Sequence, residues 1–173
     1  MFHGWENFFY LIGSAAGALI GLMFVVITLT ANQDPRRISR GAPVYVTPIV
    51  FHFAVVFIVS VISVVPRMSP PVVAVILGLC AIAGLAYSVV TTVRLFLSDW
   101  EDPIPDWSDK CFYGLLPTMV YVALASAAVA VPFFASKAIF GISAIMIGLL
   151  LLGIRNAWDL ATTLAQNAPE RRN

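Results

Sequence analysis

Five long runs in the sequence contain no Asp, Glu, Lys or Arg, and they limit the possible folds more than any other feature. The runs cover residues 8–30, 44–65, 72–93, 112–134 and 138–154. A helix needs about 20 apolar residues, within a range of roughly 17–25, to cross the hydrocarbon core of a bilayer. All five runs fit this length. The sequence therefore predicts an all-α fold, a polytopic membrane bundle of five transmembrane helices.

The composition supports this fold class and a single domain. Apolar residues make up 60% of the 173 residues and charged residues 11%, which leaves too little polar surface for a soluble domain of this length. The fifth run is short, and the segment RNAWDLATTLA after it suits a helix, so we expect that helix to continue past residue 154. The expected spans are 8–30, 44–65, 72–96, 112–134 and 138–160, within one transmembrane domain over residues 1–173.

The Lys and Arg residues between the spans predict the orientation, because cytoplasmic loops carry an excess of them. With five spans, one side of the membrane holds eight of the ten, and the other side holds Arg67 and Lys137. This predicts an N-terminus outside and a C-terminus in the cytoplasm, and the compactness of the chain favours a bacterial inner-membrane protein. A four-span alternative, in which the last two runs fuse across Pro132 and Lys137, spoils this asymmetry. The eight residues are Arg36, Arg37, Arg40, Arg94, Lys110, Arg155, Arg171 and Arg172.

The first span carries three glycines at four-residue spacing, Gly13, Gly17 and Gly21. At 100° per residue they share one helix face with Glu6 and Thr28, which lie near its two ends. Small residues let a second helix approach closely, and the pattern resembles the glycine zipper of several oligomeric membrane proteins. This face can pack within the chain, pack between subunits, or line a pore with Glu6 and Thr28 facing water.

Ionisable and hydroxyl side chains within other spans form a second set of candidates, because polar groups are costly in the hydrocarbon core. His52 lies in the cytoplasmic half of the second span, as either a neutral hydrogen-bonded histidine or a proton-sensitive gate. Tyr87, Thr91 and Arg94 lie in the same half of the third span, and Arg94 either lines a vestibule or extends to lipid phosphates. Together they predict a polar inner vestibule below an apolar outer half.

Two further features are expected at the cytoplasmic surface. Arg155 and Asp159 are i,i+4 neighbours on the last helix. The acidic loop 99–110 has irregularly spaced carboxylates and two prolines, so it is not an EF-hand. It is a solvated loop, a weak cation site or a surface that docks on the basic first loop. Its acidic residues are Asp99, Glu101, Asp102, Asp106 and Asp109.

Motifs of known chemistry are absent from the sequence. It contains no HExxH zinc site, phosphate-binding loop, dinucleotide fingerprint or GxSxG elbow, and its two cysteines have no metal or disulfide spacing. We expect no enzyme activity, cofactor, metal or nucleic-acid partner. The sequence favours a homo-oligomeric ion channel or small-solute pore, assembled through the glycine face. The alternative is a non-conducting assembly or regulatory subunit that docks a partner through this face and the acidic loop.

Overall fold

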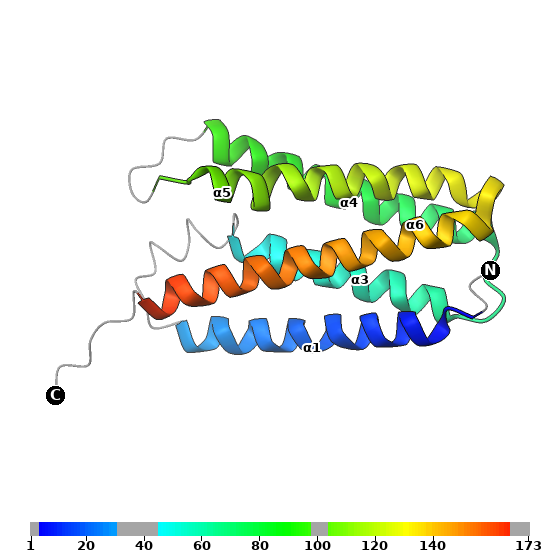
Figure 1. Ribbon diagram of the computed structural model, residues 1–173, viewed down its shortest axis with the longest axis horizontal. Coiled ribbons are helices and arrows are strands. Elements are labelled where there is room, and N and C mark those ends of the chain that lie inside the picture. Colours follow the sequence, from blue (N-terminus) through cyan, green and yellow to red (C-terminus); the bar gives the residue numbers. More distant parts are fainter. Residues whose placement is uncertain (1–3, 31–44, 98–103, 167–173) are drawn as a thin grey trace.

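The computed structural model describes residues 4–30, 45–97 and 104–166, and it is built from helices. A short helix, α5 (Trp107–Asp109), and a π-helix, η2 (Lys110–Leu115), lead into the last long helix. Figure 1 shows the long helices side by side along one axis. The long helices are α1 (Glu6–Thr30), α3 (Thr47–Val64), α4 (Pro70–Leu97) and α6 (Leu116–Gln166).

All four long helices are long and apolar enough to cross a membrane. Large apolar side chains also cover the outside of the bundle, where Leu11, Leu79 and Phe133 are each more than half exposed. An exposed apolar surface of this extent suits lipid rather than water. The expectation of an all-α, membrane-embedded protein is confirmed. The count of five crossings and the orientation stay predictions.

The 51-residue helix α6 reverses direction about a third of the way along its length. Phe134 has a non-helical backbone (φ −136°, ψ 45°), and Pro132 just before it lacks the N–H that a straight helix would use. Figure 1 shows the first arm (residues 116–133) and the second arm (residues 135–166) running antiparallel. The sequence predicts two helices here with a break between residues 134 and 138, and the reversal occurs at the start of that gap.

Prolines mark the starts of α3 and α4. Pro48 lies in the first turn of α3, and Pro70 begins α4. The N–H groups of a first turn have no partner within the helix, so proline costs no helical hydrogen bond there. Between these helices the chain turns at Arg67, whose φ of 59° lies in the left-handed region. This turn lies at the same end of the bundle as the start of α1 and the reversal of α6 (Figure 1).

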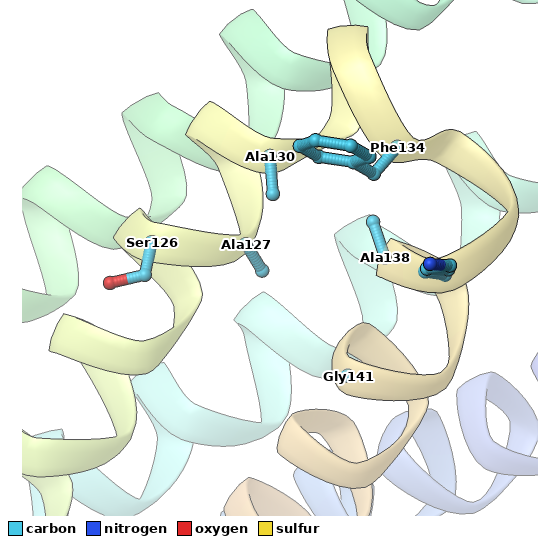
Figure 2. A pocket seen from close by; sticks show the side chains of 7 residues that line it. Ser126, Ala127, Ala130, Phe134, Ala138 and Gly141 are labelled. Atoms are coloured by element: carbon cyan, nitrogen blue, oxygen red, sulfur yellow. The ribbon is translucent and has the colours of Figure 1, made fainter.

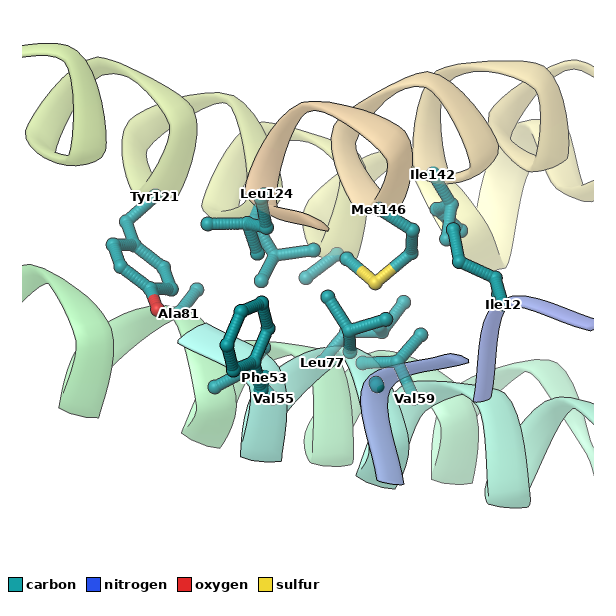
Figure 3. Close-up of a cluster of buried hydrophobic side chains, with 14 of the residues drawn as sticks. Ile12, Phe53, Val55, Val59, Leu77, Ala81, Tyr121, Leu124, Ile142 and Met146 are labelled. Carbon is teal, nitrogen blue, oxygen red and sulfur yellow. The ribbon is translucent and has the colours of Figure 1, made fainter. Parts of the chain in front are cut away.

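A contiguous core joins the long helices along the bundle. Figure 3 shows side chains from α1, α3, α4 and both arms of α6 meeting at its centre. α1 packs mainly on α3, and α4 packs mainly on α6. The second arm of α6 also reaches α1 and α3. Phe140 contacts Trp5, the residue before α1, and Gly153 faces Phe53 of α3. Fully buried members of the core include Val59, Leu77, Leu124 and Met146.

Candidate functional site

A buried polar pair joins α3 to the first arm of α6 and is the strongest candidate site. The Nδ1 atom of His52 lies 2.8 Å from the hydroxyl oxygen of Tyr121, and the two residues are 1% and 0% exposed. The Nε2 atom of His52 is buried and has no hydrogen-bond partner among the described residues. A buried polar atom without a partner costs about 1–3 kcal/mol. The unpartnered Nε2 atom makes the pair a candidate site.

The Tyr121 ring fits against α4 because Gly84 has no side chain. A Cβ atom at that position would overlap the ring, so glycine alone leaves room for it. Phe51 closes another side of the pair. Its ring centroid lies 6.3 Å from that of Tyr121 and 5.6 Å from that of Tyr87, on which it stacks. Residues of α3, α4 and α6 thus enclose the pair.

The same interface carries a second aromatic contact nearer to α5. The rings of Tyr45 and Tyr113 meet edge to face, with centroids 5.0 Å apart. Tyr45 precedes His52, and Tyr113 precedes Tyr121, by about two helical turns, or roughly 11 Å. The Tyr45 hydroxyl donates to Asp109 Oδ2 across 3.4 Å. We call the set of His52, Tyr121, Tyr45 and Tyr113 the α3–α6 seam.

The three predicted residues of α4 lie in different surroundings. Tyr87 stacks on Phe51 and so lies next to the His52–Tyr121 pair. Thr91, about one turn further along, is buried at 2% exposure, whereas Arg94 is exposed. Tyr87 therefore contacts a wall of the pair.

The glycine face of α1 is divided between the interior and the surface. Gly13 is buried against α3, and a Cβ atom there would lie 2.7 Å from the Cβ of Ser60. Gly17 faces the Phe57 ring at an ordinary van der Waals distance of 3.7 Å. A Cβ at Gly21 would meet nothing within 4 Å. Close packing within the chain therefore uses Gly13, and Gly21 remains open.

Glu6 and Thr28 occupy opposite ends of this helix. The Glu6 carboxylate accepts a hydrogen bond from the backbone N–H of Gly4 (2.7 Å). Thr28 is exposed, and its hydroxyl donates to the carbonyl of Phe24 (2.8 Å). Because Thr28 lies on the surface and His52 in the interior, the structure does not bring these two candidates into one site.

Arg155 and Asp159, the predicted neighbours on the last helix, contact different partners. The Arg155 guanidinium donates to Ser108 Oγ (2.7 Å) and lies 3.9 Å from the centroid of the Phe112 ring. Asp159 Oδ2 accepts from the Tyr113 hydroxyl (3.3 Å). Both residues thereby attach the second arm of α6 to the segment that precedes its first arm.

Asn156 belongs to no motif, yet its side chain is fully buried. Its Nδ2 atom donates to the Phe112 carbonyl (3.0 Å). In the π-helix η2 that carbonyl would accept from the residue five positions later, but this residue is Pro117, which has no N–H. Asn156 supplies the missing donor. Pro117 is the sequence signal that could have indicated an unpaired carbonyl in this turn.

Part of the acidic loop lies within the described residues. Asp106 caps α5, since its Oδ1 accepts from the backbone N–H of Asp109 (2.8 Å). Both described carboxylates of the loop therefore have partners within the chain. Among the described residues, no group of three or more His, Cys, Asp or Glu side chains is placed to hold a metal ion. Asp99, Glu101 and Asp102 lie outside the described residues.

Comparisons of the chain with protein-family models, with curated proteins and with solved structures found no match. Functional interpretation therefore depends on the arrangement of the residues. Two polar groups of residues are the main features of this arrangement. They are the enclosed His52–Tyr121 pair and the network around Asn156 at the α5 end of the bundle. The uncovered part of α1 is the third feature.

Proposed function

We propose that this chain is one subunit of a homo-oligomeric ion channel or small-solute pore in the inner membrane of a bacterium. In this proposal α1, α3, α4 and each arm of α6 cross the bilayer, with the N-terminus outside and the C-terminus in the cytoplasm. A straight α6 would be about 77 Å long, more than twice the roughly 30 Å hydrocarbon core. Reversal at Phe134 instead gives a first arm of about 27 Å, which is nearly long enough to cross, and a second arm of about 48 Å, which is long enough.

This orientation is supported by charge. Eight of the ten Lys and Arg residues then lie on the cytoplasmic side, as the positive-inside rule requires. The described members of this group include Arg94, Lys110 and Arg155. The others, Arg36, Arg37, Arg40, Arg171 and Arg172, lie outside the described residues.

The observation that carries the proposal is the uncovered face of α1. This helix buries Phe9, Ile12 and Ala16 against the rest of the chain. On its other side Tyr10 is 62% exposed, and Gly21 has open space where a side chain would lie. A helix from a second copy can approach most closely at such a position, because glycine keeps the two backbones near each other.

A conducting path would run between copies, because the interior of one chain is filled. Buried side chains form one cluster from Phe9 in α1 to Leu149 in the second arm of α6. The glycine face of α1 carries the Glu6 carboxylate at one end and the Thr28 hydroxyl at the other. Gly13 packs on α3, so in a ring of copies only the exposed part of this face, around Gly21 and Thr28, would border a central path.

His52 is the proton-sensitive element of this proposal. α3, which holds it, is the helix on which α1 mainly packs. Protonation would add a charge beside Tyr121 in the α3–α6 seam, and a shift of α3 would be passed to α1. Tyr87 and Arg94 remain candidates for the inner vestibule, whereas Thr91 is buried inside the chain and would not line a path between copies.

Reconstitution in liposomes tests the proposal with a matched pair of variants. Gly21→Leu and Gly78→Leu each add a side chain where a Cβ meets nothing within 4 Å, but Gly21 lies on the uncovered face of α1 and Gly78 on α4. We expect Gly21→Leu to abolish the oligomer and the ion flux, and Gly78→Leu to change neither. His52→Ala should remove the pH dependence of flux and leave the oligomer intact. A stable wild-type oligomer that passes no ions at any pH or voltage would end the channel proposal.

A non-conducting assembly or regulatory subunit is the second candidate, and the filled interior of the chain favours it. In that case the uncovered face of α1 docks a partner helix, and the acidic loop adds contacts at the cytoplasmic surface. Asp106 and Asp109 already have partners within the chain, so they would contribute little. Loss of partner binding in Gly21→Leu, with no flux in the wild-type protein, would support this candidate.

A further inference from the structure

A groove opens on the outside of the bundle between the two arms of α6. Its volume is about 520 Å³, and it is shallow and widely open to the outside. Figure 2 shows that both arms line it, with Phe134 at the reversal closing one end. Small side chains create the space, and at Gly141 a Cβ atom would meet nothing within 4 Å. The other lining residues are Ser126, Ala127, Ala130, Lys137 and Ala138.

The lining is apolar apart from one hydroxyl and one cation. The Ser126 hydroxyl donates to the Val122 carbonyl of its own helix (3.0 Å), so it offers no free donor to the groove. Lys137 is exposed, and among the described residues none accepts a hydrogen bond from its ammonium group or forms an ion pair with it. The groove thus combines an apolar surface with a single positive charge that has no partner in the described part of the chain.

The groove lies at the end of the bundle. The reversal of α6 is at the same end as the turn between α3 and α4 (Figure 1). In a bilayer, the ends of membrane-crossing helices reach the headgroup zone, and lysine side chains there extend their ammonium groups to the phosphates. The apolar wall from Ala138 to Gly141 continues from that level along the second arm, towards the hydrocarbon core.

We propose that this groove binds one anionic phospholipid, with an acyl chain along the apolar wall and the phosphate on the Lys137 ammonium group. A helix from a second copy fits less well, because it would have to bring a carboxylate to pair with Lys137 or leave that charge buried. A phospholipid carries a negative charge at the level of the lysine and an apolar chain below it. The proposal does not depend on whether the protein conducts ions.

Native mass spectrometry of the detergent-purified protein, titrated with phosphatidylglycerol or with phosphatidylcholine, tests this site. Lys137→Gln is expected to weaken phosphatidylglycerol binding about fivefold and phosphatidylcholine binding less, because the choline cation offsets the charge of the phosphate in phosphatidylcholine. Gly141→Leu fills the groove and should remove the binding of both lipids. Arg67→Gln, which removes the cation of the nearby α3–α4 turn outside the groove, is the matched control and should bind like the wild-type protein.

Two results would overturn the proposal. The first is a preference for phosphatidylglycerol over phosphatidylcholine that is the same in the wild-type protein and in Lys137→Gln. It would show that this cation does not hold the phosphate. The second is a change of oligomeric state in Gly141→Leu with unchanged lipid binding, which would make a second copy the occupant. Ala130→Leu, on the opposite wall, provides an independent way to fill the groove and should reproduce the effect of Gly141→Leu.

Discussion

Gly84 of α4 lies so close to the ring of Tyr121 in α6 that a methyl group on Gly84 would overlap the ring. The same ring carries the hydroxyl that meets His52, 2.8 Å away. The position of the buried polar pair therefore depends on a residue of a third helix that makes no hydrogen bond to it. Substitutions at Gly84 and at Tyr121 separate packing from hydrogen bonding.

Gly84→Ala should destabilise the protein by about 1–3 kcal/mol, because the added methyl group displaces a ring that has no free space around it. Gly78→Ala, on the same helix, is the control. A Cβ at Gly78 meets nothing within 4 Å, so this change should be neutral or stabilising by up to about 1 kcal/mol. Unfolding in detergent measures both. Equal effects of the two substitutions would contradict the close contact with Tyr121.

Tyr121→Phe keeps the ring and removes the hydroxyl. His52 then has two buried nitrogens without partners in the described part of the chain, and we expect a loss of about 1–2 kcal/mol in unfolding free energy. Tyr10→Phe removes a hydroxyl from a residue that is 62% exposed and should have little effect. If Tyr121→Phe unfolds like the wild-type protein, the Nδ1 contact adds nothing to stability.

Much of the fold could be predicted from the sequence, because a charge-free run of about 20 residues has few alternatives to a membrane helix. α1 begins at Glu6 and α4 at Pro70, each two residues before the expected start. The break near residue 134 could also be placed, since Pro132 and Lys137 interrupt the apolar run.

The partners within the site could not be predicted. His52 and Tyr121 are 69 residues apart, and nothing in either span indicates the register at which α3 and α6 pack. Periodicity likewise places Gly13 and Gly21 on one face of α1. It does not show that a neighbouring helix contacts one of them and leaves the other open. The register at which two helices pack, and the distance between them along their length, are properties of the helix pair. They cannot be read from the sequence of either helix alone.

Asn156→Ala should loosen the π-helix η2, because the Phe112 carbonyl loses its donor. The expected result is faster hydrogen–deuterium exchange over Lys110–Leu115 and a loss of about 1–3 kcal/mol. Thr162→Ala, which removes hydroxyl hydrogen bonds within its own helix, is the control. Pro117→Ala in the Asn156→Ala background restores a backbone N–H and should slow the exchange again. Unchanged exchange in Asn156→Ala would mean that water or another group replaces the amide.

Cysteine labelling can test the five-crossing topology. In a variant with Cys80 replaced by Ala, Cys111 should be protected from a membrane-impermeant maleimide applied to intact cells. A cysteine at the exposed position Ser136, introduced into a background with both native cysteines replaced, should react. The prediction is wrong if both positions react from the same side, because the first arm of α6 would then not cross the membrane.

The reversal at Phe134 also governs the order in which the bundle can be completed. The second arm of α6 leaves the ribosome after every other helix described, yet its Phe140 ring packs on Trp5 beside α1, which emerges before the other described helices. Until residues beyond 134 have been synthesised, Trp5 and Phe53 lack contacts that the finished bundle provides. Translation therefore produces a chain whose first helices stay partly unpaired until late, and this interval is when chaperones and proteases have access to them.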